Sequence, residues 1–162
     1  MAVDVIIEDA RWKTLDLTRI ANHAFFETLF LLGLHPKNFA CCVFACGNKK
    51  IKQLNCKFRG KNFPTNVLSF PASFENYEVK STLTPTEANN PHELGDIAIA
   101  FEICEKEATN SKVKFEHHVC HLIIHSVLHL LGFDHEEEKN AAKMEKIEVQ
   151  VLAKLGISDP YL

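Results

Sequence analysis

The sequence lacks a long run of apolar residues. Its longest apolar stretch, FFETLFLLGL at residues 25–34, is too short to cross a membrane and contains Glu27. The N-terminal segment MAVDVIIEDARWK carries the acids Asp4, Glu8 and Asp9 and no apolar core, so it is a poor secretory signal. These absences predict a cytoplasmic protein with no membrane span.

Paired cysteines are also missing. None of the six cysteines belongs to a Cys-x-x-Cys pair, and without a secretory signal a disulfide framework is not expected. Cys41 and Cys42 are adjacent in FACCVFAC at residues 39–46, a segment typical of a strand. We interpret these two cysteines as small buried apolar residues.

Acidic residues are absent from one segment of a chain that is acidic overall. The net charge is −3, but KKIKQLNCKFRGK at residues 49–61 contains six of the 18 Lys and Arg residues and no Asp or Glu. Such a local concentration of positive charge is what phosphate binding requires. The alternative is a solvated face of a basic helix.

The remaining composition is that of an ordinary globular protein. With 46% apolar and 24% charged residues, we expect one domain that spans residues 1–162. Apolar and β-branched runs predict strands at residues 3–9, 39–46, 66–70 and 94–101. Helical spacing predicts helices at residues 15–32, 48–58, 103–108, 114–131 and 136–155, with Asn48 as an N-cap. This order indicates a mixed α/β or an α+β class with a small sheet, and the role of the polar loop at residues 72–93 stays open.

Three histidines lie close together in HSVLHLLGFDH at residues 125–135. His125 and His129 are four residues apart, so on a helix they project from one face and can reach one Zn²⁺. Gly132 can adopt the left-handed conformation that ends the helix and turns His135 towards them. Three protein ligands leave a fourth position for water, which is the catalytic pattern of zinc. We therefore predict one Zn²⁺ per chain, the alternative being histidines that only pack or face solvent.

Two further histidine positions extend this series backwards. His121 lies one helical turn before His125, which suggests a supporting or substrate-facing role. His117 is turned by about 120° from His129 and cannot share its ion. We expect His117 and His118 to be exposed and assign them no role.

The segment lacks the glutamate that would make it a peptidase. The order His-x₃-His-x₂-Gly-x₂-His is the ligand spacing of metzincin proteases, in which a Glu directly after the first His takes a proton from water. That position is Ser126, which cannot act as a base at neutral pH. Hydrolysis of another substrate remains open, because a metal ion lowers the pKa of bound water.

A second candidate segment is FRGKNFPTNVLSFP at residues 58–71. Arg59 can hold a phosphate in a bidentate fork, and Gly60 allows the backbone to approach beside Lys61. For Asn66 and Ser69 we favour a structural role in the loop and strand. We therefore interpret Arg59, helped by Lys61, as a phosphate-binding group.

The segments RGKNFPTNVLSFP, LGDIAIA at residues 94–100 and HSVLHLLGFDH resemble, in this order, the three motifs of the YbeY family of bacterial rRNA maturation factors. The resemblance implies an α+β fold with a small mixed central sheet surrounded by helices. It also implies that His125, His129 and His135 are the metal ligands, usually of zinc, and that Arg59 engages RNA phosphate. Ser126 stands where the family often has Gly, and Phe133 where Tyr is common.

The function implied by this resemblance is a single-strand-specific, zinc-dependent endoribonuclease. Family members act in 16S rRNA 3′-end maturation and ribosome quality control, with links to the small ribosomal subunit, a small-subunit ribosomal protein and the GTPase Era. In this hypothesis Arg59 and Lys61 bind phosphate, and His121 relays protons. The alternatives are another metal-dependent hydrolase, including an atypical peptidase, and a non-catalytic ribosome-assembly factor with a structural zinc.

Overall fold

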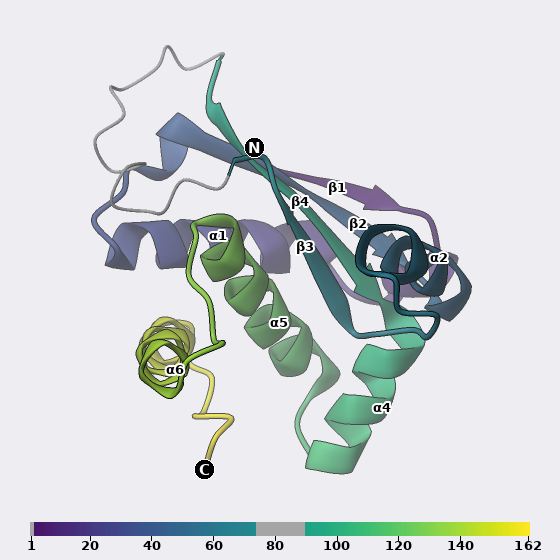
Figure 1. Cartoon of the computed structure of the whole chain (residues 1–162). Coiled ribbons are helices and arrows are strands. Elements are labelled where there is room, and N and C mark those ends of the chain that lie inside the picture. The colour runs from purple at the N-terminus through teal and green to yellow at the C-terminus, as the bar shows by residue number, and fades with distance from the viewer. Residues whose placement is uncertain (1, 74–89) are drawn as a thin grey trace.

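Four short segments pair into one mixed sheet in the computed structural model, which describes residues 2–73 and 90–162 (Figure 1). The strands are β1 (Val3–Ile7), β2 (Phe39–Cys46), β3 (Val67–Pro71) and β4 (His92–Ala100). Their order is β1-β2-β4-β3, with β1, β2 and β4 parallel and β3 antiparallel to β4. The small mixed sheet is therefore confirmed, and β3 is an edge strand among the described residues.

Helices surround this sheet, which confirms the α+β class. They are α1 (Leu17–Leu31), α2 (Asn48–Arg59), α4 (Phe101–Ser111), α5 (Phe115–Leu130) and α6 (Glu138–Lys154), with short 3₁₀ turns at Ala10–Thr14 and Pro36–Asn38. The helix predicted at 103–108 is too short, because α4 begins directly after β4. Most of the predicted loop at 72–93 lies outside the described residues. Among the helices described, none has the length and apolar character needed to cross a membrane.

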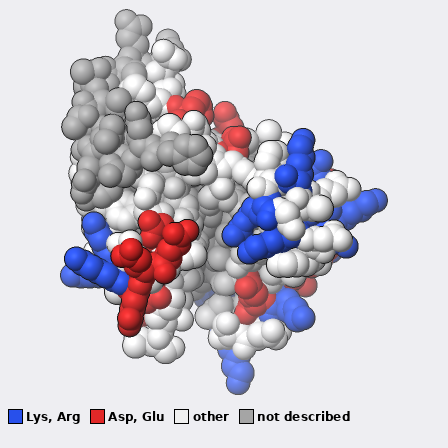
Figure 2. Space-filling model, in the orientation of Figure 1, with Lys and Arg blue, Asp and Glu red and all other residues white. Residues whose placement is uncertain are grey.

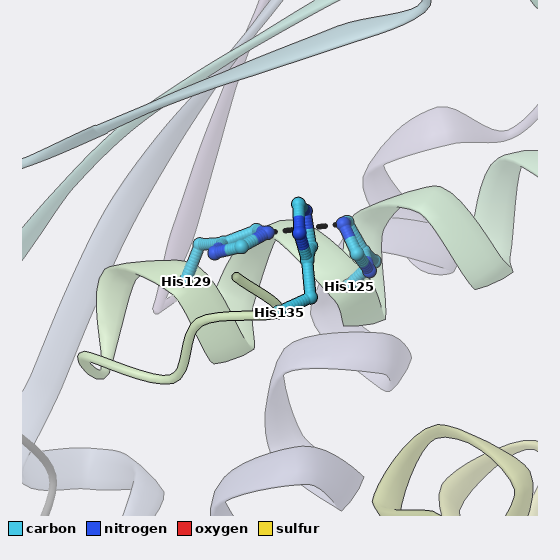
Figure 3. Close-up of side chains that lie close together, drawn as sticks. All are labelled: His125, His129 and His135. Atoms are coloured by element: carbon cyan, nitrogen blue, oxygen red, sulfur yellow. Dashed lines mark hydrogen bonds between the residues drawn. The ribbon is translucent and has the colours of Figure 1, made fainter. Parts of the chain in front are cut away.

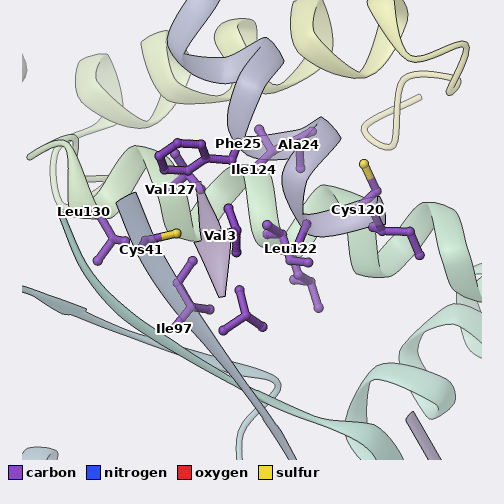
Figure 4. Close-up of a cluster of buried hydrophobic side chains, with 14 of the residues drawn as sticks. Val3, Ala24, Phe25, Cys41, Ile97, Cys120, Leu122, Ile124, Val127 and Leu130 are labelled. Atoms are coloured by element: carbon purple, nitrogen blue, oxygen red, sulfur yellow. The ribbon is translucent and has the colours of Figure 1, made fainter. Parts of the chain in front are cut away.

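The alternation of side chains along β2 and β4 gives the sheet two apolar faces. One face packs against α1 and α5, and α6 packs on these two helices to complete the main core, part of which Figure 4 shows. The strand residues of that core include Val43, Ala45, Ile97 and Ile99. The other face packs against α2 in a smaller cluster around Cys46, Ile51, Leu68, Ala98 and Ala100. The helix with the histidines and the basic helix therefore lie on opposite faces of the sheet.

The start of α2 differs from the prediction. Asn48 is not the N-cap but the first helical residue, and Gly47 precedes it. A Cβ atom at Gly47 would lie 2.7 Å from Asp9 Oδ2, so only glycine fits there without a shift. The backbone N–H of Asn48 donates to both carboxylate oxygens of Glu102 on α4, each at 3.2 Å. A negative side chain at this end also complements the helix dipole, so α4 caps α2.

The cysteines are only partly as predicted. Cys41 is buried, but Cys42 is half-buried and Cys56 is exposed. Along β2 alternate side chains point to opposite faces, so two adjacent cysteines cannot enter the same core. Burial raises the pKa of the Cys41 thiol, which disfavours the thiolate and its chemistry.

β3 is held against β4 by a close approach at Gly95. Gly95 has φ +133, and a Cβ atom there would lie 2.2 Å from the backbone oxygen of Phe70. The Ala72 N–H donates to the carbonyl of Leu94 at 2.9 Å, which fixes the end of β3 beside this glycine. The edge strand can take this position only because glycine at residue 95 has no Cβ atom.

We predict that Gly95→Ala lowers the free energy of unfolding by about 3 kcal/mol or more, because backbone strain and a backbone clash add. Gly33→Ala is a matched control, since Gly33 also has a positive φ of +75 but nothing lies within 4 Å of its Cβ position. The control should lose only about 1–2 kcal/mol. Urea denaturation of both variants measures the difference, and equal losses would contradict the close approach.

Candidate metal centre and cleft

The rotation of α5 about its axis is set by its apolar side chains. Ile124, Val127 and Leu128 are buried in the main core. Because residues four apart lie on one helix face, this burial leaves His125 and His129 together on the side that faces away from the core. Both are half-buried. The packing of α5 thus presents two imidazoles side by side.

The turn after α5 brings the third histidine beside them. Gly132 has φ +93, and the N–H of Phe133 donates to the carbonyl of Leu128 at 3.0 Å, which reverses the chain as predicted. One ligand nitrogen from each of His125, His129 and His135 then lies within 4.8 Å of the others (Figure 3). Three imidazoles at this separation form a group that could hold a metal ion.

The hydrogen bonds of the two helical histidines fix which nitrogen carries the proton. His125 Nδ1 lies 2.8 Å from Glu148 Oε1, and His129 Nδ1 lies 2.9 Å from the carbonyl oxygen of Phe133. Both partners are acceptors, so both Nδ1 atoms donate, and in the neutral rings both Nε2 atoms carry lone pairs. The two Nε2 atoms face each other at 3.0 Å, along a dashed line in Figure 3.

Two lone pairs at this distance repel unless a cation lies between them or beside them. Zn²⁺ binds imidazole nitrogen at about 2.0–2.1 Å, so two ligands of a tetrahedral site are about 3.4 Å apart. The observed 3.0 Å between His125 Nε2 and His129 Nε2 is close to that separation. His135 is exposed, so the side of the group away from α5 is open to solvent. The donor set and its geometry therefore fit a metal ion with an accessible coordination position.

The carboxylate of Glu148 was not identified in the sequence analysis. Glu148 lies on α6, its side chain is 1% exposed, and its Oε2 accepts a hydrogen bond from the Tyr161 hydroxyl at 2.8 Å. Burial by itself raises the pKa of Glu148, but hydrogen bonds from His121, His125 and Tyr161 outweigh it and lower the pKa to about 2. Glu148 is therefore ionised and holds the Nδ1 proton of His125, as carboxylates commonly do behind metal-binding histidines.

His121 joins the same network. Its Nε2 lies 3.3 Å from Glu148 Oε1 and 3.3 Å from the hydroxyl of Tyr161. Both His121 and Tyr161 line the cleft that contains the three histidines. The structure thus places His121 behind His125 and at the cleft wall, but not within the group of three ligand nitrogens.

The histidines lie in a cleft of about 870 Å³ that also contains Arg59. One wall consists of the edge strand β3 and the loop before it, and the other consists of α5 and the segment after it. The lining residues in β3 and its loop are Thr65, Asn66, Val67, Leu68, Ser69 and Pro71. Arg59 reaches this cleft from the end of α2, whereas Lys61 is exposed and does not line it.

The charges on the two sides of the cleft differ in sign. Figure 2 shows Lys and Arg side chains gathered on the right, where α2 lies in Figure 1, and a group of Asp and Glu side chains left of centre, with further Lys and Arg side chains at the left edge. On the histidine side the cleft is lined by Asp134 and Glu136, both exposed carboxylates next to His135. Asp134 and Glu136 were not predicted as site residues, although their proximity to His135 in the chain was a signal.

Ser126, at the position of the peptidase glutamate, lies away from the cleft. It is fully buried, and its Oγ has no hydrogen-bond partner among the described residues. A residue directly after His125 is rotated by about 100° around α5 and therefore faces the core. No carboxylate therefore occupies the position that the peptidase mechanism requires.

The expectation that His117 and His118 are exposed is wrong. His117 and His118 are half-buried, not exposed, and His118 Nε2 lies 3.2 Å from Glu107 Oε1. The same carboxylate accepts a hydrogen bond from Asn66 Nδ2 at 3.0 Å, while Asn66 Oδ1 accepts from the N–H of Val67. Asn66 thus lines the cleft, but its side-chain amide is hydrogen-bonded to Glu107 and to the Val67 N–H at the start of β3.

The chain matches the family model described as "Endoribonuclease YbeY" over residues 6–156. A curated endoribonuclease YbeY from Jannaschia sp. (strain CCS1) is 43% identical over 161 residues, which are 99% of this chain and 100% of the relative. Another, from Nitrobacter hamburgensis, is 48% identical over 161 residues, which are 99% of this chain and 82% of the relative. The solution structure of a Thermotoga maritima protein has a TM-score of 0.57 at 23% identity, over 94% of this chain and 91% of that one, which supports the fold alone.

We predict that Glu148→Gln lowers the affinity for Zn²⁺ by about 10- to 100-fold, because the ionised acceptor behind His125 is lost. Glu145→Gln, an exposed position on the same helix, is the control and should leave the affinity unchanged. Competition with a chromogenic chelator measures both affinities. Equal affinities for the two variants would show that Glu148 does not act on the metal group.

The metal-free protein should lose stability in acid through His129. Burial first, and then the neighbouring His125, lower the pKa of His129 from 6.5 to about 4. The unfolded chain therefore binds this proton more readily, so the free energy of unfolding falls by up to about 3 kcal/mol as the pH drops from 6.5 to 4. Glu148 contributes to the loss only at lower pH. Its pKa is lowered from 4.5 to about 2, so its protonation reduces the free energy of unfolding only below about pH 4.5.

Urea denaturation in the presence of a chelator, at several pH values, measures this loss. His129→Leu removes the titrating ring and should give a flatter profile between pH 6.5 and 4. An unchanged slope in that variant would assign the loss to another group.

Proposed function

We propose that this chain, which belongs to the endoribonuclease YbeY family, cleaves single-stranded RNA in the cleft between β3 and α5, with Zn²⁺ as its metal ion. The chain is an endoribonuclease, and therefore a nuclease and a hydrolase. The observation that supports this location is that three convergent imidazoles and an exposed guanidinium line one cleft. We take residues 1–162 as the single catalytic domain.

In this proposal His125, His129 and His135 hold one Zn²⁺ through their ring nitrogens. The orientation of His125 and His129 by Glu148 and the Phe133 carbonyl supports it, because both Nε2 lone pairs point at the same place. The low pKa of His129 keeps its ring neutral at pH 7, as a metal ligand must be. Zn²⁺, when bound, supplies a Lewis acid for an oxygen of water or phosphate.

Arg59 binds the phosphate of the scissile bond. Its guanidinium is exposed at the cleft and can give two parallel hydrogen bonds to phosphate oxygens. It also offsets the negative charge that grows on these oxygens in the transition state. Lys61 lies outside the cleft wall, so we assign it to attracting the RNA backbone.

His121 moves a proton during cleavage. When the P–O bond breaks, the leaving oxygen must gain a proton and the attacking oxygen must lose one. His121 lines the cleft, and its Nε2 is held by Glu148 and Tyr161. Asp134 and Glu136 line the same cleft and are the nearest carboxylates to His135 in the chain.

For the cellular role we propose 16S rRNA 3′-end maturation and ribosome quality control in the cytoplasm. The partners would be rRNA and the small ribosomal subunit, with a small-subunit ribosomal protein and the GTPase Era. The support is the family membership together with the basic surface of α2. Of the two alternatives, an atypical peptidase is disfavoured because Ser126 is buried away from the cleft.

We predict that Arg59→Ala lowers the cleavage rate of single-stranded RNA at least about 100-fold, since it removes a charge that stabilises the transition state. His125→Ala should abolish cleavage and zinc retention together. Lys106→Ala, an exposed charge on α4 outside the cleft, is the control and should cleave at the wild-type rate. The measurement is cleavage of precursor 16S rRNA by nuclease-free, metal-loaded protein, with the metal content determined alongside.

Other outcomes distinguish the alternatives. Cleavage retained by both Arg59→Ala and His125→Ala would mean that a different site or a contaminant acts on the RNA. Digestion of casein by the wild type would favour the peptidase. A non-catalytic assembly factor would instead unfold on metal removal and would still support assembly with Arg59→Ala.

A further inference from the structure

Two exposed phenylalanines lie on either side of Arg59 in the chain. Phe58 is 57% exposed and Phe63 is 54% exposed, although phenylalanine is usually buried in folded proteins. Phe58 is on the last turn of α2, and Phe63 is in the loop that leads to β3. Neither ring is needed for the metal group or for Arg59, so the proposed cleavage leaves them unexplained.

Both aromatic residues are held in place by packing or hydrogen bonds. The Phe58 ring packs against Phe70 on β3 with ring centroids 5.2 Å apart and planes at 65°. The backbone oxygen of Phe63 accepts a hydrogen bond at 2.9 Å from Asn55, which is 1% exposed on α2. The Phe58 ring is therefore held at the end of α2, and the backbone of Phe63 is fixed beside the same helix.

The surroundings of these rings are positively charged. The ammonium group of Lys57 lies 5.3 Å from the centroid of the Phe58 ring. Residues 49–61 contain no acid, and Lys57, Arg59 and Lys61 are all exposed. An anionic ligand with flat rings suits this combination of cations and aromatic faces, as in sites that bind single-stranded nucleic acid.

The Phe58 ring also lies across the edge strand from the cleft. Ser69 and Pro71 line the cleft, whereas Phe70 between them packs in the cluster on the other face of the sheet. The Phe58–Phe70 pair is therefore separated from the histidines by the edge strand β3. A chain that leaves the cleft past Arg59 and crosses this edge meets Phe58.

We propose that Phe58 and Phe63 stack against bases of the single-stranded RNA, outside the cleft and beyond the scissile phosphate. This inference rests on the proposed function, since it names where that substrate continues. Stacking on aromatic rings tolerates any base, so these contacts add affinity for unpaired RNA without reading its sequence. Paired bases cannot present their faces, so the rings also favour single strands.

Another pair of exposed phenylalanines provides a comparison. Phe26 and Phe30 on α1 are 47% and 58% exposed, but they stack on each other with planes at 9° and centroids 6.1 Å apart. Glu27 lies beside them in the chain, which is unfavourable for a phosphate backbone. They match Phe58 and Phe63 in exposure, and the ammonium group of Lys154 lies 5.2 Å from the centroid of the Phe30 ring. They lie on another helix than Arg59 and cover each other's faces, so they serve as a control for an exposed aromatic ring with a cation beside it.

The test compares binding of a short single-stranded RNA with that of an abasic oligonucleotide, which keeps the sugar-phosphate backbone but has no bases. A chelator is present so that the RNA is not cut, and fluorescence anisotropy measures affinity. Phe58→Ala and Phe63→Ala should each weaken binding of the RNA by roughly 5- to 100-fold and leave the abasic oligonucleotide unaffected. Phe58→Tyr should bind like the wild type, and Phe26→Ala should change neither affinity.

A second measurement does not depend on removing a ring. Trp12 is the single tryptophan and is fully buried, so Phe58→Trp introduces a distinct, exposed fluorophore. Its emission should be quenched by the RNA but not by the abasic oligonucleotide. Wild-type protein that binds neither oligonucleotide would overturn the proposed function. RNA binding that is unchanged in both alanine variants, with no quenching in Phe58→Trp, would overturn the stacking inference alone.

Discussion

The structure depends on a contact that is unfavourable by itself, the approach of two imidazole lone pairs at His125 and His129. Each Nδ1 proton is tied to an oxygen, one from Glu148 on α6 and one from the Phe133 carbonyl in the turn after α5. Neither ring can flip or change its tautomer without breaking a bond inside the fold. The packing of α5 against the sheet and the turn at Gly132 therefore have the same effect. They keep the Nε2 atoms of His125 and His129 close together, although their lone pairs repel.

A bound cation would relieve this repulsion, and the cleft contains the other residues that we propose take part in phosphodiester cleavage. The edge strand β3 forms one wall, and its position is set by the close approach at Gly95. Arg59 reaches the same cleft from the opposite face of the sheet, around the side of β3 that has no partner strand among residues 2–73 and 90–162. The site thus joins two helices that do not share a face of the sheet, and the edge strand between them sets their separation.

Local patterns in the sequence predicted what depends on near neighbours in the chain. The i, i+4 spacing of His125 and His129 and the glycine at 132 led directly to the three-histidine group, because helix geometry relates them. Glu148 was missed because it is 23 residues from His125 and reaches it only through the packing of α6 on α5. The same reason applies to Glu102, which caps α2 from α4, and to the strand order that makes β3 an edge. The basic segment and the family resemblance led to the proposed phosphate-binding role of Arg59, and the fold explains how that residue comes to line the same cleft as the histidines.

The two ends of α2 are linked, because the helix is a rigid rod that is capped by Glu102 at one end and carries Arg59 at the other. Glu102 holds the N-terminal end, and Arg59 is the last residue at the other end, about 18 Å away for a helix of this length. A tilt of roughly 10° about the capped end would move Arg59 by about 3 Å, and displacements of about 1 Å already slow catalysis strongly. The carboxylate of Glu102 does not line the cleft, yet by holding the first turn of α2 it restrains the helix whose other end carries Arg59.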